Sequence, residues 1–237
     1  QIWADFSGYS DIAIGSALLL GIRLKENFNS PYRSSDLTEF WRRWHISLST
    51  WLRDYLFFSL PGKRPGTPWP YLNLVITFAL GGLWHGASWT FAIWGVMHGA
   101  GLAVHRFVHS FRPARGPARG PARKIPAWRR VAGTIVTFHF VCATWVFFRC
   151  ATLAQARDVY RVLFDGTTGA GNVTPAIATA IAAGLAVQFL PEGWLSRVQA
   201  RFVLLPPVAQ ATALLFVAIA VRHVSGSAVA PFIYFAF

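Results

Sequence analysis

Four long stretches of this sequence carry no charged side chain, and they restrict its fold more than any other feature. A helix that crosses a bilayer needs about 20 mostly apolar residues, with a lower limit near 17. Backbone within lipid must satisfy its own hydrogen bonds, which favours helices. The alternative, a soluble protein, would have to bury four such helices in one core. We therefore predict an all-α, polytopic integral membrane protein. The stretches are Leu72 to Val104, Val131 to Phe148, Val173 to Leu190 and Phe202 to Val221.

Charge is scarce and strongly basic. Only 13% of the residues are charged, about half the share usual in soluble domains, yet the net charge is +13. Between Arg106 and Arg130 basic residues surround a Pro-Ala-Arg-Gly repeat, a low-complexity composition that cannot build a core. We predict a flexible basic loop at 110–127, on the cytoplasmic side by the positive-inside rule. A nucleic-acid-binding tail is the alternative, but no recognition motif accompanies the charges, so we expect no nucleic-acid partner.

The stretch from Leu72 to Val104 is too long for one span and too short for two. As one straight helix its 33 residues would extend about 50 Å, against a hydrocarbon thickness of about 30 Å. A second basic zone, Arg23 to Arg64, precedes it. If both basic zones are cytoplasmic, the stretch must re-enter as a hairpin, and we place the turn at Gly81–Gly86. A turn at membrane depth needs surrounding protein or a water-filled cavity, so we expect His85 to lie inside a cavity.

The segment from Asp36 to Leu60 has the periodicity of an amphipathic helix. Its apolar residues, three tryptophans among them, fall within one stripe, and arginines fall opposite. We predict an interfacial helix with Asp36 as its N-terminal cap. His45 lies at the edge of the stripe, from where its ring can point inward.

These two segments also carry a family resemblance. The run Trp41 to Ser49, followed by Trp51 to Tyr55, and the run Gly81 to Trp89 resemble the two signatures of the membrane-bound O-acyltransferase family, in its branch that O-acetylates bacterial polysaccharides. The resemblance implies a helical bundle with interfacial and re-entrant helices, multi-pass in the bacterial inner (cytoplasmic) membrane. Because family members are about twice this length, we expect 1–237 to be one membrane domain that lacks its N-terminal spans.

The resemblance also implies a chemistry. The family moves an acyl group from a thioester donor, such as acetyl-CoA, to a hydroxyl, here of an extracytoplasmic polysaccharide. His85 matches the family's near-invariant histidine and is the predicted general base; a neutral imidazole accepts a proton near pH 7. His45 matches the second histidine, which would orient the acceptor or stabilise the oxyanion. We expect membrane lipids and a periplasmic acetyltransferase as partners, and neither a metal nor a tightly bound cofactor. Further candidates for the substrate cavity are Trp84, Trp44, Asp54, Ser88 and Trp89.

Two alternatives stay open on the sequence. His85 could be a structural hydrogen-bond donor between helices, although ionisable groups at membrane depth favour a function. The chain could also be a non-catalytic conduit or scaffold that passes acyl groups to a periplasmic transferase. No nucleophile motif such as Gly-x-Ser-x-Gly occurs, so direct transfer without an acyl-enzyme on this chain is the simpler mechanism.

Overall fold

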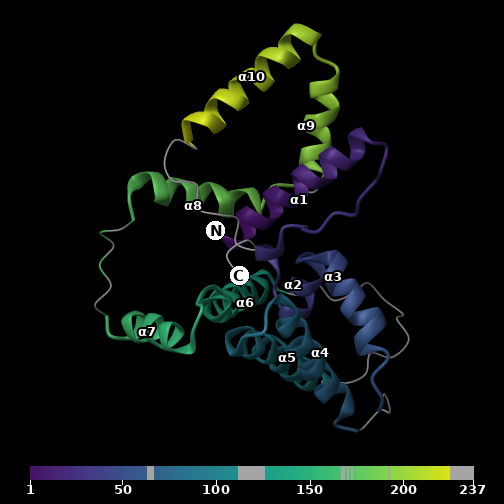
Figure 1. Cartoon of the computed structure of the whole chain (residues 1–237), viewed down its shortest axis with the longest axis vertical. Coiled ribbons are helices and arrows are strands. Elements are labelled where there is room, and N and C mark those ends of the chain that lie inside the picture. Colours follow the sequence, from purple (N-terminus) through teal and green to yellow (C-terminus); the bar gives the residue numbers. More distant parts are fainter. Residues whose placement is uncertain are drawn as a thin grey trace. The chain divides into compact units, whose positions relative to one another are not determined.

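The computed structural model describes residues 1–62, 67–111, 126–166, 169, 171, 173–191 and 193–224. Every regular element within these ranges is helical, as predicted (Figure 1). The chain divides into two compact units, Ser7–Gln188 and a smaller unit of Gln1–Phe6 with Phe189–Phe237. The predicted single domain over 1–237 stays a prediction, and the basic loop predicted at 110–127 falls largely on residues outside the described ranges.

The predicted hairpin is present in the larger unit. Helix α4 (Trp69–His85) and helix α5 (Trp89–Ser110) are joined by three residues and lie side by side (Figure 1). The turn begins after His85, a few residues later than the glycine pair that suggested it. Ser88 caps the start of α5 by accepting a hydrogen bond from the backbone N–H of Thr90. His85 is therefore the last residue of its helix, at the tip of the hairpin as expected.

Glycines allow the two helices of the hairpin to pack backbone against backbone. A β-carbon added at Gly95 would collide with the carbonyl oxygen of Phe78, and one added at Gly99 would lie 2.6 Å from the α-carbon of Val75. Small residues spaced four apart are a common means of close helix approach, especially in membranes. The close approach places the end of α4 against the start of α5.

Helix α6 (Ala127–Arg149) packs against α5 and covers the whole of the predicted stretch Val131 to Phe148. Its buried residues, Thr137, Val141, Thr144 and Phe148, recur at intervals of three and four and so form one face. Among the described residues, α6 alone is long and apolar enough to cross a membrane by itself.

The interfacial helix predicted over Asp36 to Leu60 is wrong as a single element. The structure has three short ones: α2 (Leu37–Arg43), α3 (Ile46–Trp51) and the π-helix η2 (Leu52–Phe57). The predicted cap holds, because the Asp36 carboxylate accepts the Glu39 backbone N–H at 2.8 Å. The break falls at His45, whose backbone is left-handed with φ 42°. A single left-handed residue interrupts the helical ladder without changing the hydrophobic pattern.

Neither of the two C-terminal uncharged stretches forms one continuous helix over its whole length within the described residues. Thr174 and Pro175 begin α8 (Pro175–Val187), which ends after 13 residues. Proline cannot continue a helix, and Pro206–Pro207 separates α9 (Trp194–Val203) from α10 (Pro207–Val224). The polytopic arrangement is accordingly not confirmed by helix length. The remaining elements are α1 (Ile2–Leu19), the 3₁₀ turn η1 (Pro31–Arg33) and α7 (Leu153–Phe164).

Candidate active site

The position of His45 is set by hydrogen bonds to Asn27, in a segment without regular secondary structure earlier in the chain. The carbonyl of Asn27 accepts the backbone N–H of Ile46 at 3.0 Å, and the Asn27 side chain accepts the Ser47 hydroxyl at 2.7 Å. These bonds hold the first turn of α3 after the chain has left α2. Trp44 is extended and His45 left-handed, so the imidazole leaves the path that a continuous helix would give it.

His85 stands among aromatic rings from three helices. Its ring centroid is 5.1 Å from that of Trp84 on α4, 5.4 Å from Trp94 on α5 and 5.1 Å from Phe148 on α6. The contacts to Trp94 and Phe148 are close to perpendicular, the arrangement that aromatic quadrupoles favour. The tip of the hairpin is thus fixed by packing rather than left as a loose turn.

The two histidines line the same small cavity. Its volume of about 10 Å³ is enough for one water-sized group, and its wall comes from α2, α3, η2, α4 and α5. The structure therefore brings together the residues that the two sequence signatures singled out. The lining residues are Trp41, Trp44, His45, Leu48, Leu52, Phe78, Gly81, His85 and Trp94.

Burial lowers the pKa of His45 to about 4. Desolvation disfavours the charged imidazolium, so the ring is neutral at physiological pH. A neutral imidazole has one nitrogen free to accept a proton and one that can donate a hydrogen bond. His45 can therefore position a hydroxyl but brings no positive charge to the cavity.

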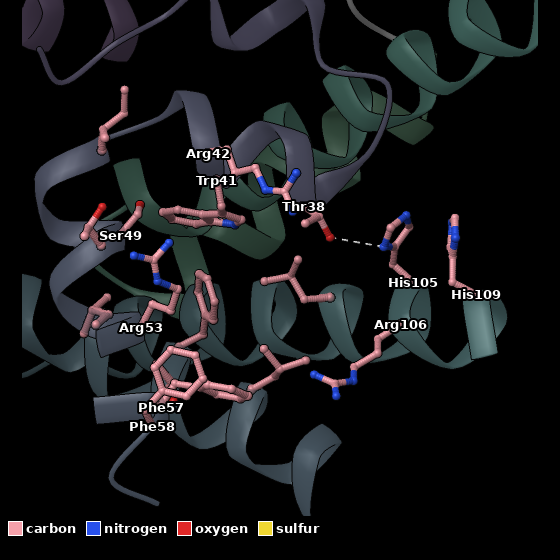
Figure 2. Close-up of a pocket in the computed structure, with 17 residues that line it drawn as sticks. Thr38, Trp41, Arg42, Ser49, Arg53, Phe57, Phe58, His105, Arg106 and His109 are labelled. Carbon is pink, nitrogen blue, oxygen red and sulfur yellow. Dashed lines mark hydrogen bonds between the residues drawn. The ribbon is translucent and has the colours of Figure 1, made fainter. Parts of the chain in front are cut away.

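A second cavity is much larger, about 760 Å³ (Figure 2). Trp41, Leu52 and Phe78 line both, so they form the wall between them. Figure 2 shows the side chains of Arg42, Arg53 and Arg106 reaching this cavity from different elements. Among the described residues that line it there is no carboxylate.

The cations of the large cavity are only partly neutralised. Arg53 forms an ion pair with Asp54 at 2.7 Å, at the exposed surface. Arg42 and Arg106 have no ion pair within the described part of the chain, although Arg106 lies over the Tyr71 ring at 6.0 Å. The cavity is therefore electropositive and suited to an anionic ligand.

A third cavity, of about 580 Å³, lies on another side of the small one. His45, Leu48 and Leu52 line both, and Trp84 also lines the third cavity. The small cavity thus shares lining residues with two larger cavities, and Leu52 lines all three. Two reactants could approach the histidines from different cavities.

The other predicted site residues are distributed unevenly. Trp44 lines the small cavity and Trp84 the third one. Ser88 serves as the helix cap described above, and Trp89 is 77% exposed. Asp54 pairs with Arg53 and lines none of the three cavities. No group of three or more His, Cys, Asp or Glu side chains among the described residues could hold a metal ion.

A buried hydrogen-bond chain behind the site was not foreseen. The indole N–H of Trp41 donates to His98 Nδ1 at 3.3 Å, so the other nitrogen of His98 carries the proton and donates to Thr144 Oγ1 at 2.8 Å. The Thr144 hydroxyl in turn donates to the Val141 carbonyl at 2.9 Å. The chain ties α2, α5 and α6 together. Its members lie 57 and 46 residues apart in sequence, so no local pattern could have paired them.

Comparison with known proteins gives consistent matches. The model of the family described as membrane-bound O-acyltransferase matches residues 1–148. The chain is 48% identical over 165 residues to a protein of Azotobacter vinelandii named as a probable alginate O-acetylase, covering 70% of this chain and 31% of that protein. It is 45% identical over 162 residues to the peptidoglycan O-acetyltransferase of Helicobacter pylori, covering 68% and 29%. It is 31% identical over 150 residues to the teichoic acid D-alanyltransferase of Bacillus subtilis, covering 60% and 36%. The chain thus spans about a third of the length of these curated relatives.

Proposed function

The chain belongs to the membrane-bound O-acyltransferase family, and from that premise we propose that it transfers an acetyl group from a thioester to a hydroxyl of an extracytoplasmic polysaccharide. The three relatives above are named for acylating alginate, peptidoglycan and teichoic acid. Acetyl is favoured over D-alanyl because the two acetylating relatives are 48% and 45% identical, against 31% for the D-alanyltransferase.

The observation that carries the proposal is the shared cavity of His45 and His85, bordered by two larger cavities. His85 is the general base. It accepts the proton of the acceptor hydroxyl, and the oxygen attacks the thioester carbonyl carbon. The tetrahedral intermediate collapses, the carbon–sulfur bond breaks, and the departing thiolate takes the proton back from His85. His45, neutral and buried, orients the acceptor hydroxyl.

The large cavity is the proposed donor site. Its arginines suit the phosphates of a carrier such as coenzyme A, because guanidinium groups bind phosphate oxygens in a bidentate manner. The third cavity, lined mainly by apolar residues of α3, η2 and α4, is the proposed approach for the acceptor. In this arrangement the protein is a multi-pass protein of the bacterial inner membrane, surrounded by its lipids, and it works with a periplasmic acetyltransferase.

The test uses the purified full-length protein with an acetyl thioester and a soluble glycan fragment. Thioester loss coupled to glycan acetylation is expected for the wild type. It should fall at least about a hundredfold in His85→Ala, the usual scale for a general base. His139→Ala is the matched control, since His139 is exposed on α6 and, among the described residues, its ring hydrogen-bonds the Ile135 carbonyl of the same helix alone. Acetyl passage that does not depend on His85 would support a conduit instead.

A further inference from the structure

The indole N–H of Trp94 is a buried hydrogen-bond donor with nothing to bind. Trp94 lies on α5 and is 4% exposed. Its Nε1 is buried and has no hydrogen-bond acceptor among the described residues. A buried donor without an acceptor costs free energy, and native proteins keep such groups rarely. The unpaired donor therefore needs an explanation.

The packing around the indole supplies none. Its ring neighbours are Phe148 and His98, each at 5.1 Å, His85 at 5.4 Å and Trp41 at 6.0 Å, and none of them accepts the Trp94 N–H. Phenylalanine has no acceptor, and both nitrogens of His98 are engaged by Trp41 and Thr144. The indole N–H of Trp41 donates to His98, whereas the indole N–H of Trp94 has no acceptor among the described residues.

The location of the donor suggests its ligand. Trp94 lines the small cavity together with His45 and His85, and its ring centroid is 5.4 Å from that of His85. The cavity, of about 10 Å³, has room for one water-sized group, which is also the size of a carbonyl oxygen. The neighbouring larger cavity shares Trp41, Leu52 and Phe78 with it as lining residues.

We propose that the indole N–H of Trp94 donates the hydrogen bond that stabilises the oxyanion of acyl transfer. The inference rests on the proposed function and adds a catalytic residue to it. When the acceptor oxygen attacks, the carbonyl electron pair moves onto the thioester oxygen, and that oxygen accepts the Trp94 hydrogen bond. When the carbon–sulfur bond breaks, the pair returns to the carbonyl and the bond to Trp94 weakens. The indole neither gains nor loses a proton.

The chemistry of indole suits this role. It is a donor only, so it cannot compete with His85 for the acceptor's proton. It is held by aromatic packing before the substrate arrives, and a donor fixed in advance needs no reorganisation as charge develops. The hydrogen bond is strongest when the oxyanion forms, because a charged oxygen accepts a stronger hydrogen bond than a neutral carbonyl.

The test replaces Trp94 with Phe in the full-length protein and measures acetyl transfer and unfolding together. We expect kcat to fall about 10²- to 10³-fold, the usual loss on removing one oxyanion donor. The KM for the thioester should change less than about threefold, and the melting temperature should stay equal or rise because an unpaired polar group is gone. Trp41→Phe is the matched control. It removes a partnered N–H from the same wall, so it should lower the melting temperature and reduce kcat less than tenfold.

The outcomes separate the two proposals. Wild-type kcat in Trp94→Phe, or a loss no larger than in Trp41→Phe, would overturn the role of Trp94. If the smaller ring destabilises the fold, replacing Trp94 with 3-benzothienyl-alanine removes the N–H and keeps the bicyclic shape, and the same fall in kcat is expected. A wild-type protein that transfers no acetyl group would remove the proposed function itself.

Discussion

The substitution Gly99→Ala tests the packing that holds the site together. Gly99 lies on α5, where its α-carbon faces the backbone of α4. An added methyl would stand 2.6 Å from the α-carbon of Val75 and 2.9 Å from the Leu74 carbonyl oxygen. Carbon atoms in contact prefer separations of about 3.5–4.0 Å, so the helices would have to part by about 1 Å. Neither obstacle is a side chain that could rotate away.

The expected magnitude follows from two opposing terms. Overpacking of this kind costs about 1–3 kcal/mol, and the upper end applies because both obstacles are backbone. Replacing glycine by alanine inside a helix returns about 1 kcal/mol. The net loss should be about 2 kcal/mol. Gly15→Ala on α1 is the control: among the described residues, no atom outside its own helix turn lies within 4 Å of the added methyl, so only helix propensity acts and a gain of about 1 kcal/mol is expected.

Both variants are measured by denaturant unfolding of the full-length protein in detergent micelles, with acetyl transfer measured alongside. Gly99→Ala should be less stable and less active, since separating α4 from α5 moves His85 away from Trp94. Gly15→Ala should be at least as stable as the wild type. A Gly99→Ala protein as stable as Gly15→Ala would refute the close approach of the two helices.

Three further predictions concern the segment before the hairpin and the large cavity. Burial lowers the pKa of His45 to about 4, so the unfolded chain takes up a proton before the folded protein does as the pH falls, and up to about 3 kcal/mol of stability should be lost between pH 6.5 and 4. Asparagine tolerates the left-handed backbone at position 45, so His45→Asn should lose less stability over this range. Melting temperatures of both proteins at pH 7 and 4.5 measure the difference. Asp36→Ala should lower the free energy of unfolding by about 1 kcal/mol because the N-terminal cap of α2 is lost. Asp36→Asn keeps a capping side chain and should retain most of that stability when both variants are unfolded with denaturant. Arg42→Ala and Arg106→Ala should each raise the KM for a coenzyme A thioester about tenfold, an effect that shrinks at high salt; an unchanged KM in both would exclude this cavity as the donor site.

The hairpin was predictable because it follows from lengths. A stretch of 33 uncharged residues between two basic zones cannot cross the bilayer once or twice, and the structure turns it back at its middle. The two C-terminal uncharged stretches were predicted as single spanning helices because they lack charges, and that prediction failed. Pro206 and Pro207 lie inside an uncharged stretch, and the helix boundary falls at them, a signal that the sequence already contained.

The break at His45 was not predictable from periodicity. A stripe of apolar residues at helical spacing persists through one left-handed residue, and the bonds that stabilise the break come from Asn27, outside the segment. The same holds for Trp41, His98 and Thr144, which meet only in the folded chain. The motifs predicted a role for the two histidines, but long-range contacts decide which cavity they share and which donors surround them.

The central claim is that His45 and His85 serve one reaction in one cavity, and a double-mutant cycle tests it most directly. Initial rates of acetyl transfer are compared for His45→Asn, His85→Ala and the double variant. When two residues serve the same step, removing either one already removes their joint contribution to the rate. The double variant should therefore be no slower than His85→Ala alone. A double variant whose rate loss equals the product of the two single losses, or a His85→Ala protein with the wild-type rate, would contradict a shared role for the two histidines.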